Sequence, residues 1–224
     1  KFLAERTSNK SFGIVEGLSI IGTSAETYSS SSPDQLKNAV IQLENLTKND
    51  LCETIIFVIG ENGFELAKSC DTKIPVVKVG NWIGPLLVKA AINNIKTVIL
   101  FGYHGKLIKL AGGIFNTHNH LADARIEILV YLAVEEKLPS EIISKLAKNS
   151  TIEDCYLLLE KLDESLANRL WKKLSKTIEK RSMEYVNRYI KTDMQIATVI
   201  FDRQRQIRWF GSLGEKYISI FHKP

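Results

Sequence analysis

The sequence has few cysteines and no long hydrophobic run. Its 224 residues include three cysteines, none in a Cys-x-x-Cys pair. An odd number of widely spaced cysteines argues against a disulfide framework and a structural zinc site. No apolar run approaches the about 20 residues of a membrane-spanning helix, and no leader is visible. We therefore expect a cytoplasmic protein without a membrane partner. Because the chain begins with Lys1 rather than Met, we also expect that an N-terminal portion is missing.

Motifs for the common cofactors and for covalent catalysis are also missing. No expected strand is followed by G-x-G-x-x-G or by a G-K-[ST] loop, which argues against NAD and ATP as ligands. No Ser-His-Asp or Cys-His spacing supports a covalent nucleophile. His118 and His120 could be read as a metal pair, but no third ligand stands at a suitable spacing. We therefore expect no protein-bound metal.

Positive charge is concentrated in one segment. The chain has 45% hydrophobic and 25% charged residues and a formal net charge of +5. Residues 169–191 hold eight Lys or Arg against two Glu, a local balance of +6. A nucleic-acid surface would interleave aromatic or glycine residues or carry a known motif, and neither is present. A solvated helix face is the simpler interpretation, so we expect no nucleic-acid partner; a homo-oligomer stays open.

Short apolar runs alternate with amphipathic runs in the first half of the chain. Apolar runs without polar alternation are typical of strands buried on both faces of a parallel sheet. The expected fold class is α/β: a mainly parallel sheet with helices on both faces, followed by a helical region and a C-terminal β-hairpin. The expected strands are Phe12–Ile21, Thr54–Ile59, Ile74–Val79 and Thr97–Phe101, the main helices are Ser32–Leu46, Phe64–Ser69, Trp82–Ile92, Leu121–Lys137 and Glu164–Lys191, and the hairpin joins Gln195–Phe201 to Ile207–Phe210. We expect a ligand-binding α/β domain over residues 1–138 and a helical region with the hairpin over residues 139–224.

Every expected parallel strand ends at a glycine. Ligands of open parallel sheets bind at the carboxyl ends of the strands, and glycine lets the backbone approach a ligand closely. One such exit would mean little, but four suggest a shared cleft, although tight turns alone remain the alternative. The exits are Gly22-Thr-Ser24, Gly60-Glu-Asn-Gly63, Gly80-Asn-Trp82 and Gly102-Tyr-His-Gly105.

The fourth exit opens a block, Gly102–Arg125, that holds three of the four histidines. Lys106 and Lys109 are three residues apart, which predicts one face of a short helix that Gly112 and Gly113 then end. Thr117 or Asn119 is a plausible cap of the next helix. Free amides at a helix start favour an anion. Asp123 in the first turn could instead complement the helix dipole, and the two lysines could form a solvated face.

The block Gly102-Tyr-His-Gly-Lys-Leu-Ile-Lys-Leu-Ala-Gly-Gly-Ile-Phe-Asn-Thr-His118, followed by Ala-Asp-Ala-Arg-Ile-Glu-Ile-Leu129, closely resembles the cobalt-precorrin-5B (C1)-methyltransferases (CbiD) of anaerobic cobalamin biosynthesis, in their cyanobacterial form. The segment Leu18-Ser-Ile-Ile-Gly-Thr-Ser24 is similar to that family's first strand exit. Family members usually continue with glycine, an apolar pair and proline, where this chain has Ala25-Glu-Thr-Tyr-Ser-Ser30.

The resemblance implies transfer of a methyl group from S-adenosylmethionine to ring carbon C1 of a cobalt-containing corrinoid. The donor is already activated, so the protein mainly aligns the reactants and excludes water. The changed loop and the missing portion motivate an alternative, a non-catalytic corrinoid carrier or sensor; a nucleotide-dependent oxidoreductase is a weaker one. The expected cofactor-binding residues are Gly22, Thr23, Ser24, Gly60, Asn62, Gly80 and Asn81, and the expected substrate-binding residues are His104, Lys106, Lys109, Asn116, Thr117, His118 and Arg125.

Overall fold

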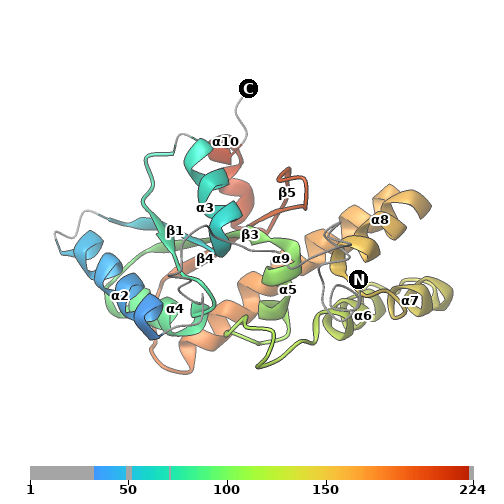
Figure 1. The fold of residues 1–224 in the computed structure, drawn as a ribbon, viewed down its shortest axis with the longest axis horizontal. Helices are drawn as coiled ribbons and strands as arrows, with labels where there is room; N and C mark the ends of the chain where they lie inside the picture. Colours follow the sequence, from blue (N-terminus) through green and yellow to red (C-terminus); the bar gives the residue numbers. More distant parts are fainter. Residues whose placement is uncertain (1–32, 49–51, 71, 222–224) are drawn as a thin grey trace, which may run out of the picture.

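The computed structural model describes residues 33–48, 52–70 and 72–221. In this part of the chain, five strands form one sheet in the order β2-β1-β3-β4-β5 (Figure 1). The first four are mutually parallel, and β5 is antiparallel to β4. The α/β class, the mainly parallel sheet and the C-terminal hairpin are therefore confirmed. The strands are β1 (Thr54–Val58), β2 (Val76–Lys78), β3 (Thr97–Tyr103), β4 (Gln195–Phe201) and β5 (Ile207–Phe210).

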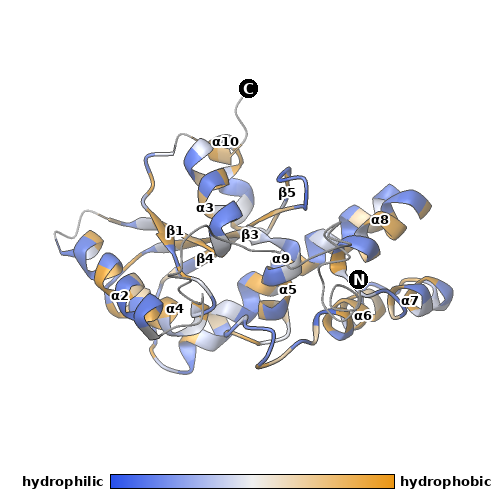
Figure 2. Ribbon diagram, viewed as in Figure 1, coloured by the Kyte–Doolittle hydropathy of each residue, from blue (hydrophilic) through white to orange (hydrophobic). Residues whose placement is uncertain are grey.

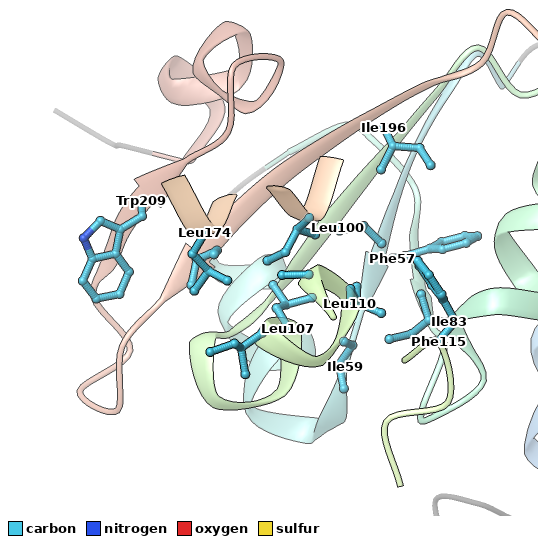
Figure 3. Packing of buried hydrophobic residues seen from close by; sticks show 14 of the residues in the cluster. Phe57, Ile59, Ile83, Leu100, Leu107, Leu110, Phe115, Leu174, Ile196 and Trp209 are labelled. Atoms are coloured by element: carbon cyan, nitrogen blue, oxygen red, sulfur yellow. The ribbon is translucent and has the colours of Figure 1, made fainter. Parts of the chain in front are cut away.

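Successive residues of a strand point to opposite faces of the sheet. Both faces carry apolar side chains here, and helices cover both. On one face, Phe57 and Leu100 belong to a large buried cluster with α2, α4, α5 and α9 (Figure 3). On the other face, Ile56 and Phe101 pack against α3 and α10. The helices are α2 (Pro33–Thr47), α3 (Gly60–Ser69), α4 (Ile83–Ile92), α5 (His104–Ala111), α6 (Arg125–Glu135), α7 (Ser140–Leu146), α8 (Ile152–Leu162), α9 (Glu164–Asn187), the 3-10 helix η2 (Gly214–Tyr217) and α10 (Ile218–Phe221).

The long helix α9 follows the helical region and leads the chain back to strand β4 of the sheet. The side chain of Asp163 caps it by accepting hydrogen bonds from the amides of Ser165 and Leu166, at 2.8 and 3.3 Å. Its buried apolar residues belong to the same cluster as residues of β1 and β3. Because β4 also pairs with β3, the expected C-terminal region completes the sheet of the expected N-terminal domain. The boundary near residue 138 stays a prediction.

The strands and the hairpin were predicted closely, whereas two helix starts were wrong. The segment Gly60–Gly63 was expected as a loop, but α3 already begins at Gly60. The helix expected from Leu121 begins at Arg125, with Ala124 as its N-cap. Other ends differ by a few residues. The strand expected at Phe12–Ile21 and the cap Ser32 lie outside the described residues.

The basic segment 169–191 forms most of α9, and ion pairs neutralise much of its charge. Lys172 lies 2.8 Å from Glu215, and Arg181 lies 3.1 Å from Glu184. Figure 2 shows that this helix carries both polar and apolar residues along its length. These pairs support the interpretation as a solvated helix face. Over residues 33–48, 52–70 and 72–221, no helix combines the length and the apolar character that crossing a membrane requires.

Candidate functional site

The candidate site lies where the connections of β1 and β3 diverge. After β1 the chain passes through α3 to β2, on one side, whereas after β3 it passes through α5 to α9 to β4, on the other. In open α/β sheets, ligands bind at such a switch point, at the carboxyl ends of the strands. Gly60 follows β1 there, and a Cβ placed on it would lie 4.0 Å from Nζ of Lys106, on α5. The two predicted exits therefore meet at this point.

Lys106 is a predicted cation that the structure leaves without a partner among the described residues at this edge. Its side chain is exposed, and its ammonium has no hydrogen-bonding or ionic partner among the described residues. Nearby protein atoms still displace part of its water, which lowers the pKa of Lys106. An ammonium in this position favours an anionic ligand, because pairing recovers the interaction energy that was lost with the water.

Lys109 has a different role from the one expected, because it is fully buried. Its ammonium donates to the carbonyl oxygens of Thr117 and Ala122, at 3.1 and 2.7 Å, and to Oδ1 of Asn119, at 2.7 Å. These three acceptors use all three N–H groups of the side chain. The alternative in which both lysines form one solvated face is therefore wrong: Lys109 holds the loop that precedes α6, and of the two lysines only Lys106 faces outward.

The loop before α6 is also tied to the exit of β2. The hydroxyl of Thr117, which is buried, donates to Oδ1 of Asn81 at 2.9 Å, and the Thr117 amide donates to the Asn81 carbonyl at 3.2 Å. Two sets of predicted residues, cofactor-side Asn81 and substrate-side Thr117, are thus in direct contact. Neither Thr117 nor Asn119 caps α6, because both are engaged by distant partners. That part of the prediction was wrong.

The remaining polar residues of this loop bond locally. Oδ1 of Asn116 accepts from the His118 amide at 3.1 Å, and Nδ1 of His118 accepts from the His120 amide at 3.3 Å. Arg125, at the start of α6, donates from Nε and Nη2 to Asp123 at 2.6 and 2.7 Å. The hydrogen bonds from Arg125 hold the pKa of Asp123 below its usual range. Asp123 therefore acts as the partner of Arg125.

On the cofactor side, Gly60 and Gly80 both adopt positive φ, of 78° and 56°. A side chain would strain the backbone at these turns. Asn62 lies in the first turn of α3, and its Oδ1 accepts from Arg205 at 2.8 Å. Trp82 follows Asn81, and its indole nitrogen is buried without a partner in the described part of the chain. The predicted residues Gly22, Thr23 and Ser24 lie outside the described residues, so their role stays a prediction.

His104 is buried inside an aromatic cluster and is not exposed at the carboxyl edge of the sheet. Its Nδ1 accepts from the indole Nε1 of Trp171 at 2.9 Å, and its Nε2 lies 2.7 Å from Oε2 of Glu153. Since Nδ1 accepts, the proton of the neutral ring is on Nε2 and points to Glu153. Its ring also stacks on Trp209, at 5.6 Å and 13°. Both nitrogens are occupied, so we correct its expected contact with a substrate carboxylate to a positioning role.

The pair His118 and His120 lies within the described residues 33–48, 52–70 and 72–221. No group of three or more His, Cys, Asp and Glu side chains there is placed to hold an ion. His118 and His120 lie with ring centroids 5.0 Å apart, and His118 already accepts a main-chain hydrogen bond. We read these histidines as hydrogen-bonding groups.

Comparison with known proteins finds relatives that match nearly the whole chain. Residues 116–211 match the family model described as the C-terminal domain of CbiD. The chain is 70% identical over 221 residues to the cobalt-precorrin-5B C(1)-methyltransferase of Prochlorococcus marinus subsp. pastoris, covering 99% of this chain and 59% of that relative. It is 71% identical over 221 residues to the protein of that name from strain MIT 9515, with the same coverage.

The chain belongs to the CbiD family. A more distant relative of the same name, from Prochlorococcus marinus strain NATL2A, is 49% identical over 220 residues. No solved structure matches the chain. The chain spans 59% of the length of the first two of these relatives. The resemblance seen in Gly102–Leu129 is therefore confirmed at the level of the family.

Several residues of this CbiD chain that shape the site were not predicted. Glu153 on α8 and Trp171 on α9 hold His104, and Arg203 follows β4 at the same edge as Tyr103. Glu153 and Trp171 stand in ordinary amphipathic helices, so no local pattern distinguishes them. The turn 202–206 did offer a signal, since it follows a strand that pairs in parallel with β3.

His104 predicts a loss of stability in mild acid. Burial lowers the pKa of His104, against the opposing effect of Glu153, so the unfolded chain takes up a proton before the folded protein does. The stability due to neutral His104 is full above the unfolded pKa, about 6.5, and is lost as the pH falls towards the folded pKa. Urea denaturation should show a decrease of up to about 1.4 kcal/mol per pH unit over that range. The slope should shrink in His104→Gln and persist in His120→Gln, which changes an exposed ring; equal slopes would refute this assignment.

Proposed function

We propose that this chain takes part in the S-adenosylmethionine-dependent methylation of ring carbon C1 of cobalt-precorrin-5B, which gives cobalt-precorrin-6A in anaerobic cobalamin biosynthesis. The names of its relatives support the reaction, and therefore a methyl donor and a cobalt-precorrin substrate. The observation that carries the proposal is the position of Lys106. Its ammonium lies at the switch point of β1 and β3, without a partner among the described residues, where an anionic ligand would bind.

The residues at the exits of β1 and β2 fit the methyl donor. Gly60 and Gly80 present backbone without side chains, and the buried indole N–H of Trp82 has no acceptor in the described part of the chain. An acceptor atom of S-adenosylmethionine would satisfy that N–H, which otherwise costs about 1–3 kcal/mol. The donor itself supplies an electrophilic methyl group. The chain has to position the two reactants, because alignment alone removes a large part of such a barrier.

On the substrate side, the residues present act on the carboxylates of the macrocycle. Lys106 offers a point charge that can bind a carboxylate. Arg125 offers the N–H groups on Nη1, since Nε and Nη2 already donate to Asp123. Lys109 contributes indirectly, because its three hydrogen bonds hold the loop that carries Asn116 and His118. The division into a donor side and a substrate side follows the strand exits and remains our proposal.

The direct test is turnover by the complete gene product. We expect incubation with cobalt-precorrin-5B and S-adenosylmethionine to increase the corrinoid mass by one methyl group, with formation of S-adenosylhomocysteine. A protein that binds the corrinoid and transfers no methyl group would instead be the non-catalytic carrier. The three described cysteines are free, which agrees with our proposal that the protein works in the reducing cytoplasm.

Lys106→Gln tests the residue that carries the proposal. Losing one charge-assisted contact should raise the KM for the corrinoid by roughly tenfold. The KM for S-adenosylmethionine should change little. Lys96→Gln is the matched control, because Lys96 is an exposed lysine before β3, at the opposite edge of the sheet. An unchanged corrinoid KM in Lys106→Gln would remove Lys106 from the substrate site.

A further inference from the structure

A line of hydrogen bonds runs from the carboxyl edge of the sheet into the helical region. At its outer end, Tyr103 is the last residue of β3 and is only partly buried. Its hydroxyl donates to Oε2 of Glu153, on α8, at 3.3 Å. The same oxygen lies 2.7 Å from Nε2 of His104, whose Nδ1 accepts from Trp171 at 2.9 Å. Side chains from β3, α5, α8 and α9 are therefore joined in one line.

The inner end of this line is fixed by burial. His104 is fully buried, and Glu153 is 5% exposed. Burial lowers the pKa of His104, so the ring is neutral and directs its one N–H to Glu153. Gly105 lets the phenol lie over the start of α5, since a Cβ there would lie 2.5 Å from the Tyr103 ring. The phenol and the carboxylate are thus held in one arrangement.

Glu153 is kept in its charged form. Burial alone would raise its pKa, but the hydrogen bonds from His104, from the main-chain N–H of Arg203 and from Tyr103 outweigh it and leave the pKa below its usual value. A buried charge of this kind contributes little net stability compared with a well-packed apolar residue. Buried ionisable groups with specific partners mark functional sites, and this one bonds to a side chain at the carboxyl edge.

Tyr103 can act on a ligand only as an acceptor. Its single hydroxyl proton is directed to Glu153, so the phenol offers other groups only the remaining lone pairs of its oxygen. Burial and the charge of Glu153 raise the pKa of Tyr103, so the phenol stays protonated at neutral pH. Lys106 stands in the first turn of α5, whose N-cap residue is Tyr103. The acceptor and the ammonium that we propose to bind the substrate therefore lie at the same helix start.

We propose that Tyr103 is the catalytic residue that takes up the proton lost by the macrocycle on methylation, and that Glu153 positions the Tyr103 hydroxyl and receives its proton. The inference rests on the proposed function and adds a proton acceptor to it. Transfer of a methyl cation leaves one positive charge on the ring. A ring N–H or C–H removes that charge when it releases a proton.

The step balances in atoms and in charge. An electron pair of the ring forms the new bond to the methyl carbon, and the pair of the carbon–sulfur bond leaves with the sulfur. The ring proton passes to the phenol oxygen of Tyr103 while the phenol proton passes to the carboxylate of Glu153, which becomes neutral. At 3.3 Å, the hydrogen bond between them is longer than the about 2.8 Å typical of O–H···O, as is common for catalytic groups before a substrate binds.

The test measures methyl transfer in a single turnover by the complete gene product, with cobalt-precorrin-5B and S-adenosylmethionine. Tyr103→Phe removes only the hydroxyl. It should slow the transfer by about 100-fold, the usual contribution of a positioned proton acceptor. The protein concentration that gives half the maximal rate should stay within about twofold, because the hydroxyl acts in the transition state. An unchanged rate in Tyr103→Phe would overturn the proposal.

Tyr131→Phe is the matched control. Tyr131, on α6, also donates to a glutamate, to Oε1 of Glu135 at 2.9 Å, but it is 60% exposed. The same kind of hydroxyl–carboxylate pair is thus removed outside the site, and the rate should not change. Urea denaturation should give the same midpoint for Tyr103→Phe and for the wild type. An equal loss of rate in Tyr131→Phe, or a loss in Tyr103→Phe that follows from unfolding, would show that the hydroxyl has only a structural role.

The role of Glu153 is tested by coupling. Glu153→Gln keeps the shape of the side chain but cannot take up the proton. It should slow methyl transfer by at least about tenfold in the wild-type background and cause little further loss in Tyr103→Phe, because groups that act as a unit are not additive. Equal losses in both backgrounds would remove Glu153 from the proton transfer. Should Glu153→Gln not fold, Glu153→Asp keeps the charge, draws the carboxylate back and is compared in the same two backgrounds.

The wild-type protein separates this inference from the proposed function. A complete gene product that transfers no methyl group would contradict the proposed function, and this step with it. A protein that methylates cobalt-precorrin-5B equally fast with and without the Tyr103 hydroxyl would keep its function and lose this proton acceptor.

Discussion

Replacing Lys109 with methionine is expected to lower the free energy of unfolding by about 3–5 kcal/mol. Methionine keeps most of the side-chain volume but cannot donate hydrogen bonds. The carbonyl oxygens of Thr117 and Ala122 and the side-chain oxygen of Asn119 would lose their shared donor. Urea denaturation measures the global effect. Hydrogen exchange would show the local one, as faster exchange of the amides from His118 to Ala122.

Lys106→Met is the internal control for this experiment. Lys106 lies three residues earlier on the same helix, is exposed, and has no hydrogen-bonding or ionic partner in the described part of the chain. Its replacement should change the free energy of unfolding by no more than about 0.5 kcal/mol. Equal effects of the two substitutions would show that the buried contacts of Lys109 do not stabilise the loop.

Gly214→Ala is expected to cost about 3 kcal/mol or more of stability. A Cβ on Gly214 would lie 2.1 Å from the carbonyl oxygen of Thr198, which belongs to the inner strand β4 and cannot move aside. The amide of Gly214 also donates to Oε1 of Glu179 at 3.0 Å, and that oxygen accepts from the Thr198 amide as well. Displacing the turn would therefore break the contacts of a buried carboxylate.

Gly63→Ala provides the contrasting case. Gly63 is also buried, but it lies inside α3, and an added Cβ would meet its nearest neighbour, the Phe201 ring, at an ordinary 3.6 Å. Alanine is the better helix former, so this change should be neutral or stabilise the protein by up to about 1 kcal/mol. Thermal unfolding of the two variants distinguishes them. A Gly214→Ala protein as stable as Gly63→Ala would mean that the turn adapts without cost.

Local patterns were sufficient for the described strands and for the hairpin. The run Thr54–Ile59 and the hairpin partners Gln195–Phe201 and Ile207–Phe210 were predicted from apolar and β-branched residues, and the sheet contains them nearly as expected. The glycine after β1 also led to our proposal that a ligand binds at the carboxyl edge of the sheet. These features depend on a residue and its near neighbours, which is the information that periodicity and turn chemistry contain.

The roles of individual polar residues were decided by contacts between distant segments. Lys106 and Lys109 have the same side chain at helical spacing, yet one is exposed and the other is enclosed by the loop it holds. Thr117 is of a residue type that often caps helices, but its hydroxyl donates a hydrogen bond to Asn81, 36 residues earlier. Glu153 reaches His104 across 49 residues.

The sequence of this chain by itself therefore determined its family and its α/β class, and it led to our proposal for the edge of the sheet at which a ligand binds. Only the tertiary structure decided which cation faces that edge and which polar groups are buried. The physical reason is that a buried donor or acceptor needs a partner, and the partner is whichever group the fold brings within reach. In this protein the partners of Lys109, His104 and Glu153 come from segments that no local pattern connects.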